Sequence, residues 1–215
     1  AHLPVEWYRG DLHDAAVVQR AAARVNYVMH LASSYRETFS SRQVQYDVHV
    51  NGTKRLAEAV ASQPDFRRFV HVSTVGVHGH IEHPPAAETY RFAPGDEYQE
   101  TKLQAEQWIM NHGRASGLPV TVVRPAAIYG PGETRLLKLF RMASCKVVPL
   151  IGDGRCLYHL IHVDDLVEFM TCAAVHPKAV HEAFICGNRE PITIQEFVAI
   201  AGRCIGVKNR FVRLP

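Results

Sequence analysis

Short runs of β-branched and other apolar residues alternate along this chain with longer segments in which apolar residues recur at helical spacing. The pattern predicts strands at residues 5–9, 27–31, 69–73, 120–124, 147–150 and 183–186, and helices at residues 15–25, 43–61, 97–116, 134–143, 163–175 and from 194 onward. The strand at 27–31 is expected to be buried. Such alternation is typical of an α/β fold, a parallel sheet with right-handed crossovers and helices on both faces. Ligands of open α/β sheets bind beyond the carboxyl ends of the strands, so the residues that follow each strand are the candidate site residues.

Local signals support several of these boundaries. Asp14 is the predicted N-cap of the helix at residues 15–25, because an aspartate side chain accepts hydrogen bonds from the free N–H groups of a first helical turn. Thr193 and Glu196 have the spacing of a capping box at the start of the last helix. The glycine, proline and histidine residues at 76–95 and the turn residues at 125–133 predict loops.

Composition and charge exclude several classes of protein. Hydrophobic residues make up 47% of the chain and charged residues 21%, which is typical of a globular protein. The net charge of +3 is spread thinly, so no nucleic-acid partner is expected. No apolar run approaches the roughly 20 residues that span a bilayer, so no membrane segment is expected. The five cysteines include no Cys-x-x-Cys pair, which favours a reducing cytoplasm over a disulfide framework or a zinc site.

Tyr98 and Lys102 lie four residues apart in a predicted helix, which places both side chains on one helical face. A tyrosine with an ordinary pKa of about 10 exchanges protons poorly at neutral pH. A lysine ammonium one turn away favours the phenolate, so Tyr98 is a candidate general acid and base. Thr74 follows the strand at 69–73 and is a candidate for holding a substrate oxygen. The structural alternative is an ordinary half-buried tyrosine, a solvated lysine and a threonine that simply ends a strand.

Two other groups of polar residues have stronger structural explanations. Asp164 and Asp165 stand at the start of a predicted helix, where capping explains them better than catalysis. His78, His80 and His83 lie in one loop without a carboxylate at ligand spacing, so no metal site is expected there.

A series of short motifs spans nearly the whole chain. They are Gly10-Asp11-Leu12, His30-Leu31-Ala32, Asn51-Gly52-Thr53, residues 69–74 with Val77-His78-Gly79, Tyr98-x-x-x-Lys102, Arg124-Pro125 with residues 128–132, and residues 161–166. In these motifs and their order the chain resembles an extended short-chain dehydrogenase/reductase of the NAD-dependent epimerase/dehydratase type. The resemblance implies a doubly wound, Rossmann-like sheet, with a dinucleotide-binding domain at residues 1–130. It also implies a smaller substrate-binding part at residues 131–215, interleaved with the last strands of the sheet.

The resemblance implies a role for individual residues as well. Thr74, Tyr98 and Lys102 would be catalytic, and Lys102 would also bind the nicotinamide ribose. The cofactor would be NAD or NADP, with NAD favoured, and its further contacts would be Asp11, Leu12, Leu31, Ala32, Pro125 and Ile128. Asn51 would orient the catalytic helix or relay a proton. The candidate substrate contacts are Ser73, His80, Tyr129, Arg135, Arg155 and Tyr158.

The chain also departs from the family pattern. The family's glycine-rich turn between the first strand and first helix, which holds the pyrophosphate, has no counterpart here. Ala1 instead aligns with a point after the family's opening βαβ unit. We therefore expect that the sequence is part of a longer protein. In this expectation the opening βαβ unit is missing from this sequence, which also stops inside the substrate-binding part.

These observations predict an NAD(P)-dependent oxidoreductase or epimerase that moves hydride to or from a secondary alcohol or ketone. Nucleotide sugars are candidate substrates, but Tyr158 and His159 occupy the region where the family often has a diphosphate-binding arginine. A steroid- or dihydroflavonol-type carbonyl reductase is therefore the alternative, and a non-catalytic cofactor-sensing regulator is a third. We expect a cytoplasmic homodimer. The sequence leaves open the exact substrate, the choice among epimerase, dehydratase and reductase, and the choice between NAD and NADP.

Overall fold

The computed structural model describes residues 4–34 and 41–214, which form two compact units. The first unit comprises Ala1–Arg124 and Phe169–Ile185, and the second comprises Pro125–Glu168 and Cys186–Pro215. The chain thus leaves the first unit after Arg124 and returns to it for part of a helix and a strand. Each unit is described separately below.

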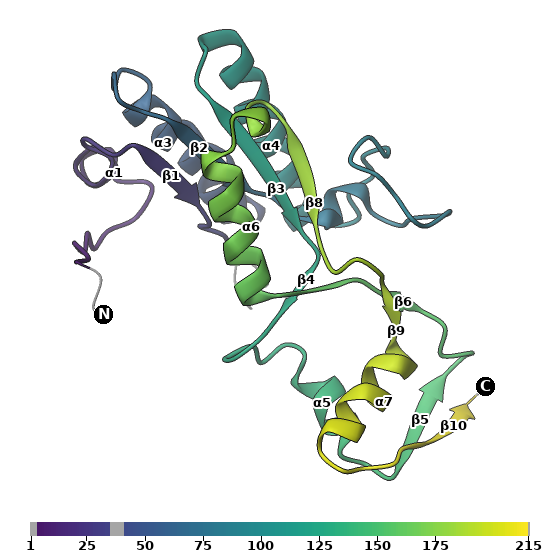
Figure 1. Cartoon of the computed structure of the whole chain (residues 1–215). Helices are drawn as coiled ribbons and strands as arrows, with labels where there is room; N and C mark the ends of the chain where they lie inside the picture. The colour runs from purple at the N-terminus through teal and green to yellow at the C-terminus, as the bar shows by residue number, and fades with distance from the viewer. Residues whose placement is uncertain (1–3, 35–40, 215) are drawn as a thin grey trace. The chain divides into compact units, whose positions relative to one another are not determined.

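A four-stranded sheet forms the centre of the first unit, in the order β1-β2-β3-β8 (Figure 1). The strands are β1 (Tyr27–His30), β2 (Arg68–Val72), β3 (Val120–Pro125) and β8 (Ala183–Cys186). β1 and β3 both run parallel to β2, and β8 lies beside β3, where the Val122 N–H donates to the Glu182 carbonyl at 2.9 Å. The carboxyl ends of β1 and β2 therefore share one edge of the sheet.

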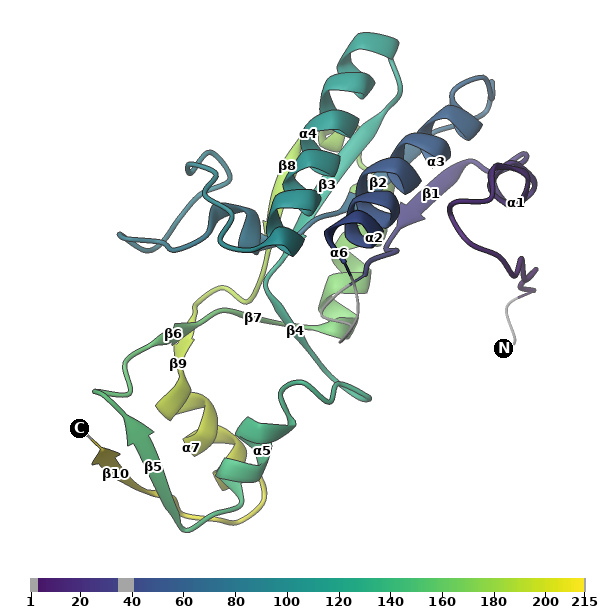
Figure 2. The same cartoon turned by 180° about the vertical axis from the view of Figure 1, so that it is seen from behind.

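Helices cover both faces of this sheet, as Figures 1 and 2 show. α1 (Ala15–Ala21), α3 (Gly52–Val60) and α4 (Glu97–Ser116) pack on one face around fully buried Phe69, Ile109 and Val120. α6 (Val163–Val175) covers the other face from Phe169 onward. The buried Arg68 side chain joins this part of α6 to the sheet by donating to the Ala173 and His176 carbonyls at 3.4 and 3.1 Å.

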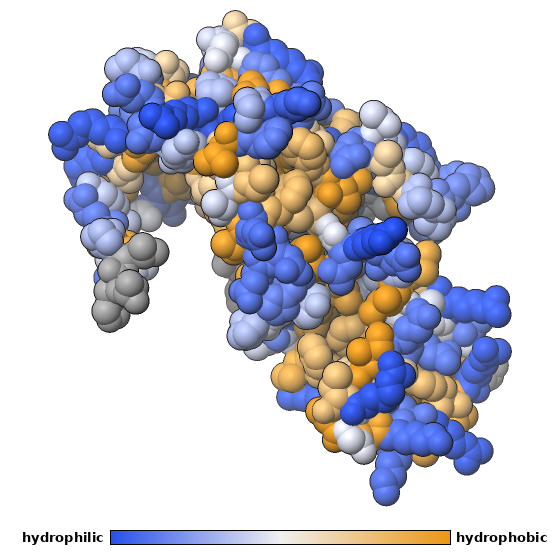
Figure 3. Space-filling view, viewed as in Figure 1, coloured by the Kyte–Doolittle hydropathy of each residue, from blue (hydrophilic) through white to orange (hydrophobic). Residues whose placement is uncertain are grey.

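Apolar side chains also gather on the surface over α6 and β8 (Figure 3). Phe169, Cys172, Ala173 and Phe184 line a cavity of about 370 Å³ there. The rings of Phe169 and Phe184 meet edge to face at 5.8 Å. This cavity lies on the face of the sheet opposite to α4.

Capping residues explain where the helices of the first unit begin and end. The Asp14 side chain accepts from the N–H groups of Ala16 and Val17, as predicted. Asp96 caps α4 by accepting from the Gln99 N–H at 2.8 Å. At the other end of α4, Gly117 has a φ of 79°, the left-handed conformation that ends helices.

The helix predicted at residues 43–61 contains an interruption. α2 (Arg42–Tyr46) leads into a π-helical turn, η1 (Asp47–Asn51), and α3 follows directly. A π-helical turn inserts one residue into the helical register and changes which side chains face inward.

The second unit consists of short strand pairs and two helices. β4 (Ala127–Tyr129) pairs with β7 (Leu160–His162), β6 (Leu157–Tyr158) with β9 (Ile192–Thr193), and β5 (Val147–Ile151) with β10 (Arg210–Leu214). α5 (Leu137–Ala143) and α7 (Ile194–Cys204) pack together around Leu136, Val148, Leu150, Phe197 and Val198. The capping box predicted for Thr193 and Glu196 is present.

Three predictions of secondary structure are wrong. Residues 5–9 form no strand: Trp7 is 89% exposed, and none of the described residues pairs with this segment. Residues 125–133 are not only turns, because pairing with β7 makes a strand of Ala127–Tyr129. The strand predicted at 27–31 is not buried: only His30 is buried, because among the described residues β1 has a neighbour on one side alone.

In the part of the chain that the structure describes, no helix combines the length and the apolar character needed to cross a membrane. Two short 3-10 helices complete the structure, η2 (Val75–His78) after β2 and η3 (Pro177–Ala179) before β8.

We predict that Gly113→Ala destabilises the protein although alanine is the better helix former. A Cβ at Gly113 would lie 2.7 Å from the Val120 Cγ2 and 2.9 Å from the Leu118 carbonyl oxygen, so α4 would have to move away from β3. Overpacking of this kind costs about 1–3 kcal/mol. Urea denaturation measures the loss, with Gln107→Ala on the exposed side of α4 as the control, for which a change within about 0.5 kcal/mol is expected.

Candidate functional site

Lys102 is buried beneath α4 although its side chain is charged. It is 3% exposed, and its Nζ donates to the Val72 carbonyl oxygen at 2.7 Å. Burial lowers the pKa of Lys102 to about 8, while the nearby Glu106 carboxylate opposes this shift. At pH 7 the ammonium therefore keeps its charge, one helical turn from half-buried Tyr98.

The residues that follow β2 lie next to this lysine contact. The Ser73 Oγ is buried and has no hydrogen-bond partner among residues 4–34 and 41–214. The Thr74 side chain accepts from the Gly76 N–H at 3.1 Å and so caps η2. The bond from Lys102 to Val72 thus fixes α4 against the end of the strand that carries both hydroxyl groups.

The cofactor candidates of the first unit lie along the same edge of the sheet. Leu31 and Ala32 directly follow β1 and are exposed, and Leu31 is 55% exposed. Leu12 lies against the start of α3, where a Cβ on Gly52 would meet its side chain at 2.9 Å. Asp11 is exposed, and its carboxylate accepts from the His13 N–H at 2.9 Å.

Three buried histidines surround Lys102 beneath α3 and α4. His30 lies at the end of β1, His49 in η1 and His71 in β2, and each is at most 3% exposed. Burial lowers the pKa of His30 and of His49 to about 3, with a further contribution from the Lys102 charge. The same causes hold the pKa of His71 well below its usual range, and its two ring nitrogens have no partner in the described part of the chain. The three imidazoles are therefore neutral at pH 7.

The π-helical turn decides which residue of the segment faces Tyr98. Asn51, which the family resemblance assigned to orientation or proton relay, donates to the Asp47 carboxylate at 2.6 Å. His49 instead has its ring edge to face with Tyr98, at 5.4 Å between centroids. Sequence reasoning missed His49, and its only signal was a histidine two positions before the Asn-Gly-Thr motif.

Except for His80, the remaining candidates belong to the second unit. Pro125 is buried, and Ile128 pairs with Ile161 across β4 and β7. Tyr129 meets His162 edge to face at 5.1 Å, and Tyr158 packs on the core of this unit. Arg135 forms an ion pair with Glu133, and Arg155 is exposed in a turn where its N–H donates to Asp153 at 2.9 Å.

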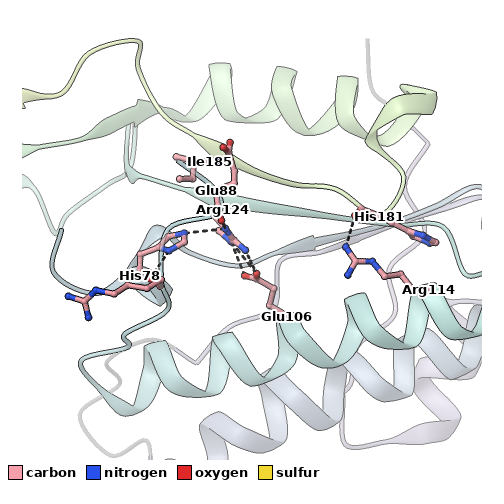
Figure 4. Close-up of polar contacts among 8 residues, drawn as sticks. His78, Glu88, Glu106, Arg114, Arg124, His181 and Ile185 are labelled. Carbon is pink, nitrogen blue, oxygen red and sulfur yellow. Dashed lines mark hydrogen bonds and ion pairs between the residues drawn. The ribbon is translucent and has the colours of Figure 1, made fainter. Parts of the chain in front are cut away.

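A buried ion pair joins α4 to the end of β3 (Figure 4). Glu106 and Arg124 are each 4% exposed, and the Arg124 Nε lies 3.1 Å from the Glu106 Oε1. The Arg124 Nη1 also donates to the Glu88 carbonyl at 2.8 Å and to the His78 Nε2 at 3.1 Å. Because arginine only donates, the His78 Nε2 is an acceptor and its Nδ1 donates to the Arg91 carbonyl at 3.2 Å.

This network closes the base of the loop that follows η2. The Ala93 N–H donates to the Val77 carbonyl at 3.0 Å, and Gly79, with a φ of 64°, lies so close to the Ala93 carbonyl that a side chain would overlap it. The Glu88 carboxylate accepts from the Ile185 N–H at 3.0 Å (Figure 4). His80 is exposed farther along this loop, and the described His, Cys, Asp and Glu residues form no group of three that could hold a metal ion.

We predict that Glu106→Gln costs about 3–5 kcal/mol of unfolding free energy, because it leaves the buried Arg124 charge uncompensated. The double variant Glu106→Met/Arg124→Met should lose less than the sum of the single variants. Glu100→Gln is the matched control on the same helix: its pair with Arg42 is exposed, and a change below about 1 kcal/mol is expected. Additive single-variant effects in urea denaturation would contradict this prediction.

We also predict a loss of stability as the pH falls below about 6.5. The histidines at 30, 49 and 71 protonate more easily in the unfolded chain than in the folded one, so acid favours unfolding. The window runs from pH 6.5 down to about 3 for His30 and His49, and lies below 6.5 for His71. Each contributes a slope of about 1.4 kcal/mol per pH unit in that window. His71→Leu should reduce the slope measured by urea denaturation at pH 5 and 7, whereas His83→Leu, in the exposed loop, should not.

A model of the NAD dependent epimerase/dehydratase family matches residues 1–187 of the 215. The chain is 33% identical over 170 residues to a dTDP-glucose 4,6-dehydratase of Streptomyces antibioticus, covering 75% of this chain and 50% of that protein. It is 29% identical over 227 residues to a 3beta-hydroxysteroid-dehydrogenase/decarboxylase of Arabidopsis thaliana, covering 98% of this chain and 40% of that protein. The chain thus spans half the length of these relatives or less.

Solved structures share the fold. RMD from Pseudomonas aeruginosa, complexed with NADPH, has a TM-score of 0.82 at 22% identity, covering 100% of this chain and 78% of that one. The dTDP-glucose 4,6-dehydratase DesIV from Streptomyces venezuelae, with NAD bound, has a TM-score of 0.76 at 24% identity, covering 96% and 66%. These likenesses confirm the predicted Rossmann-like α/β fold with a parallel sheet. The family model matches well over half of the residues of this chain. The chain therefore belongs to the NAD dependent epimerase/dehydratase family.

Proposed function

We propose that this protein is an NAD(P)-dependent enzyme that oxidises a secondary alcohol or reduces the corresponding ketone, either as a net reaction or as a step of an epimerase or dehydratase cycle. The observation that carries the proposal is the buried ammonium of Lys102, bonded to the end of β2 and one turn from Tyr98. A charge held there favours the tyrosine phenolate, which makes Tyr98 the group that takes or returns the proton of the substrate hydroxyl.

The neighbouring residues fit a nicotinamide cofactor. Leu31 and Ala32 offer an exposed apolar segment at the carboxyl edge of the sheet, where open α/β folds bind dinucleotides. The unpartnered Ser73 Oγ offers a hydrogen-bonding group beside it. When bound, the cofactor would supply hydride transfer. In this proposal Asp11 and Leu12 contact its adenine end, Lys102 its ribose, and Pro125 and Ile128 its ring. The family's solved structures with NAD or NADPH support this class of cofactor without choosing between the two.

Each candidate residue then has a proposed role toward the substrate. Thr74 holds the reacting oxygen, with Ser73 and His80 as further contacts on the same side of the sheet. Tyr98 moves the hydroxyl proton, and Lys102 stabilises the phenolate that remains. In the second unit, Tyr129, Arg135, Arg155 and Tyr158 are the proposed contacts to the rest of the substrate.

A nucleotide sugar is the substrate class that the charges favour. Basic residues outnumber acidic residues in the second unit, which suits a diphosphate. The relative from Streptomyces antibioticus is a dTDP-glucose 4,6-dehydratase, which agrees with this class. A sterol or a similar apolar alcohol is the second candidate, because the Arabidopsis relative named for a steroid dehydrogenase matches 98% of this chain. We propose a cytoplasmic homodimer as the working form.

We predict that Tyr98→Phe in the full-length enzyme lowers kcat by about 10²–10⁴-fold, because the proton of the hydroxyl group loses its acceptor. Cofactor affinity should change by less than about threefold, since the phenyl ring is kept. Tyr27→Phe, at the opposite end of β1 and exposed, is the control expected to keep full activity. Turnover is followed by nicotinamide absorbance with nucleotide sugars and sterols as alternative substrates. A Tyr98→Phe enzyme with undiminished turnover would exclude the proposed mechanism, and binding without turnover of any substrate would favour a regulatory protein.

A further inference from the structure

His49 stands where three parts of the first unit meet. It belongs to the π-helical turn η1, is 1% exposed, and lies between the segment that follows β1 and the first turns of α4. A buried imidazole has to find partners for both ring nitrogens. The partners it finds determine which nitrogen carries the hydrogen.

The Nε2 of His49 faces two donors. The Ser34 backbone N–H donates to it at 3.1 Å, and the Ser33 Oγ lies at 3.1 Å as well. A backbone N–H cannot accept a hydrogen bond, so Nε2 carries no hydrogen. The hydrogen of the neutral ring is therefore on Nδ1.

The Nδ1 of His49 continues the chain of hydrogen bonds into α4. It donates to the Thr101 Oγ1 at 2.8 Å. Thr101 turns its own hydrogen toward the carbonyls of Glu97 and Tyr98, at 3.0 and 3.1 Å. The imidazole therefore joins the segment after β1 to the backbone of Tyr98, while its ring edge contacts the Tyr98 ring.

The backbone of His49 is fixed from the other side. Its carbonyl accepts from the Thr53 hydroxyl, which in turn accepts from the His30 Nε2 at 3.0 Å. His30 ends β1, so the hydrogen-bond chain runs from β1 through α3 and η1 to α4. His30, Thr53, His49 and Thr101 are all buried, and each bond between them has a defined direction of donation.

We infer that His49 is a positioning residue. Through its Nδ1–H tautomer and its bonds to Ser33 and Ser34, it holds the preceding Leu31–Ala32 segment at a fixed distance from the Tyr98 hydroxyl. The inference rests on the proposed function, because it assigns those two groups to cofactor and proton transfer. A displacement of about 1 Å between reacting groups costs about 100-fold in rate. Substrate affinity depends on other contacts and should change little.

Protonation of His49 breaks this arrangement. A hydrogen on Nε2 would point at the Ser34 N–H, and no carboxylate among the described residues forms an ion pair with His49. The charged group of Lys102 and the ring of His30 face it from α4 and β1, and they add to the burial that lowers its pKa to about 3. The Nδ1–H tautomer is therefore retained across the neutral range.

The first test reads the tautomer directly and needs no activity. In ¹⁵N-labelled full-length protein, the His49 signals should show a protonated Nδ1 and an unprotonated Nε2 at pH 7. His49→Asn identifies the signals by their disappearance. A protonated Nε2 would overturn the inference whatever the enzyme does.

The second test separates positioning from general stability. We predict that His49→Phe lowers kcat by about 100-fold with KM for the substrate changed less than threefold, and that His49→Asn, which keeps a donor and an acceptor, recovers part of the loss. In a Tyr98→Phe background the His49→Phe change should have little further effect, because the group it positions is already removed. His71→Leu removes a buried imidazole of the same cluster whose ring nitrogens have no hydrogen-bond partner among the described residues, and it should keep kcat within about threefold.

The outcomes distinguish the two proposals. A His49→Phe enzyme with wild-type kcat overturns the role of His49. So does a His49→Phe enzyme whose loss of kcat is matched by that of His71→Leu and accompanied by the same loss of thermal stability. Equal turnover by wild type and Tyr98→Phe overturns the proposed function instead, and the tautomer measurement still decides whether the hydrogen-bond chain exists.

Discussion

The candidate site of the first unit depends on the hydrogen bond between the buried Lys102 ammonium and the Val72 carbonyl. An ammonium group loses its hydration when it is buried, and it remains charged only where carbonyl dipoles and a carboxylate compensate. Val72 supplies the carbonyl, and Glu106 supplies the carboxylate one turn farther along α4. Burial keeps the nearby histidines neutral, and the Lys102 charge adds to this effect. Neutral imidazoles can act as directional links between helices. One buried cation thus ties α4 to the end of β2 and contributes to the protonation state of its surroundings.

Much of the sheet and its helices could be predicted from the sequence. The bounds predicted for α4 and α6 agree with the structure, because Asp96 and Gly117 give α4 unambiguous ends and the apolar residues of Val163–Val175 recur at helical spacing. The short strands β6, β7, β9 and β10 could not be predicted. Each has only two to five residues and exists because of a partner distant in sequence, such as Ile161 for Ile128. Local pattern carries no information about such pairing.

In the candidate site, too, some features could be predicted from the sequence and others could not. That Tyr98 and Lys102 share one face of a helix could be predicted, because residues four apart do so in any α-helix. That Lys102 is buried could not, because its burial depends on where α4 packs against β2. His49 escaped notice because a regular helix through residues 43–61 would have turned a different face inward, and only the π-helical turn brings its ring to Tyr98. For the same reason Asn51, the residue that motif matching suggested, points to Asp47 instead.

The base of the loop after η2 is fixed to the rest of the first unit, so the loop tip can change in sequence independently of the candidate site. Val77, Gly79 and Ala93 fasten the two ends of the loop to each other, and Arg124 holds the Glu88 carbonyl from beneath. The tip between them, which includes exposed His83, makes no comparable bonds to the sheet in the described structure. Residues at the tip can therefore be exchanged, inserted or deleted without moving Thr74 or Tyr98. Selection for a new substrate can act on the tip alone, while Thr74 and Tyr98, the residues proposed to act on the substrate hydroxyl, keep the geometry they inherited.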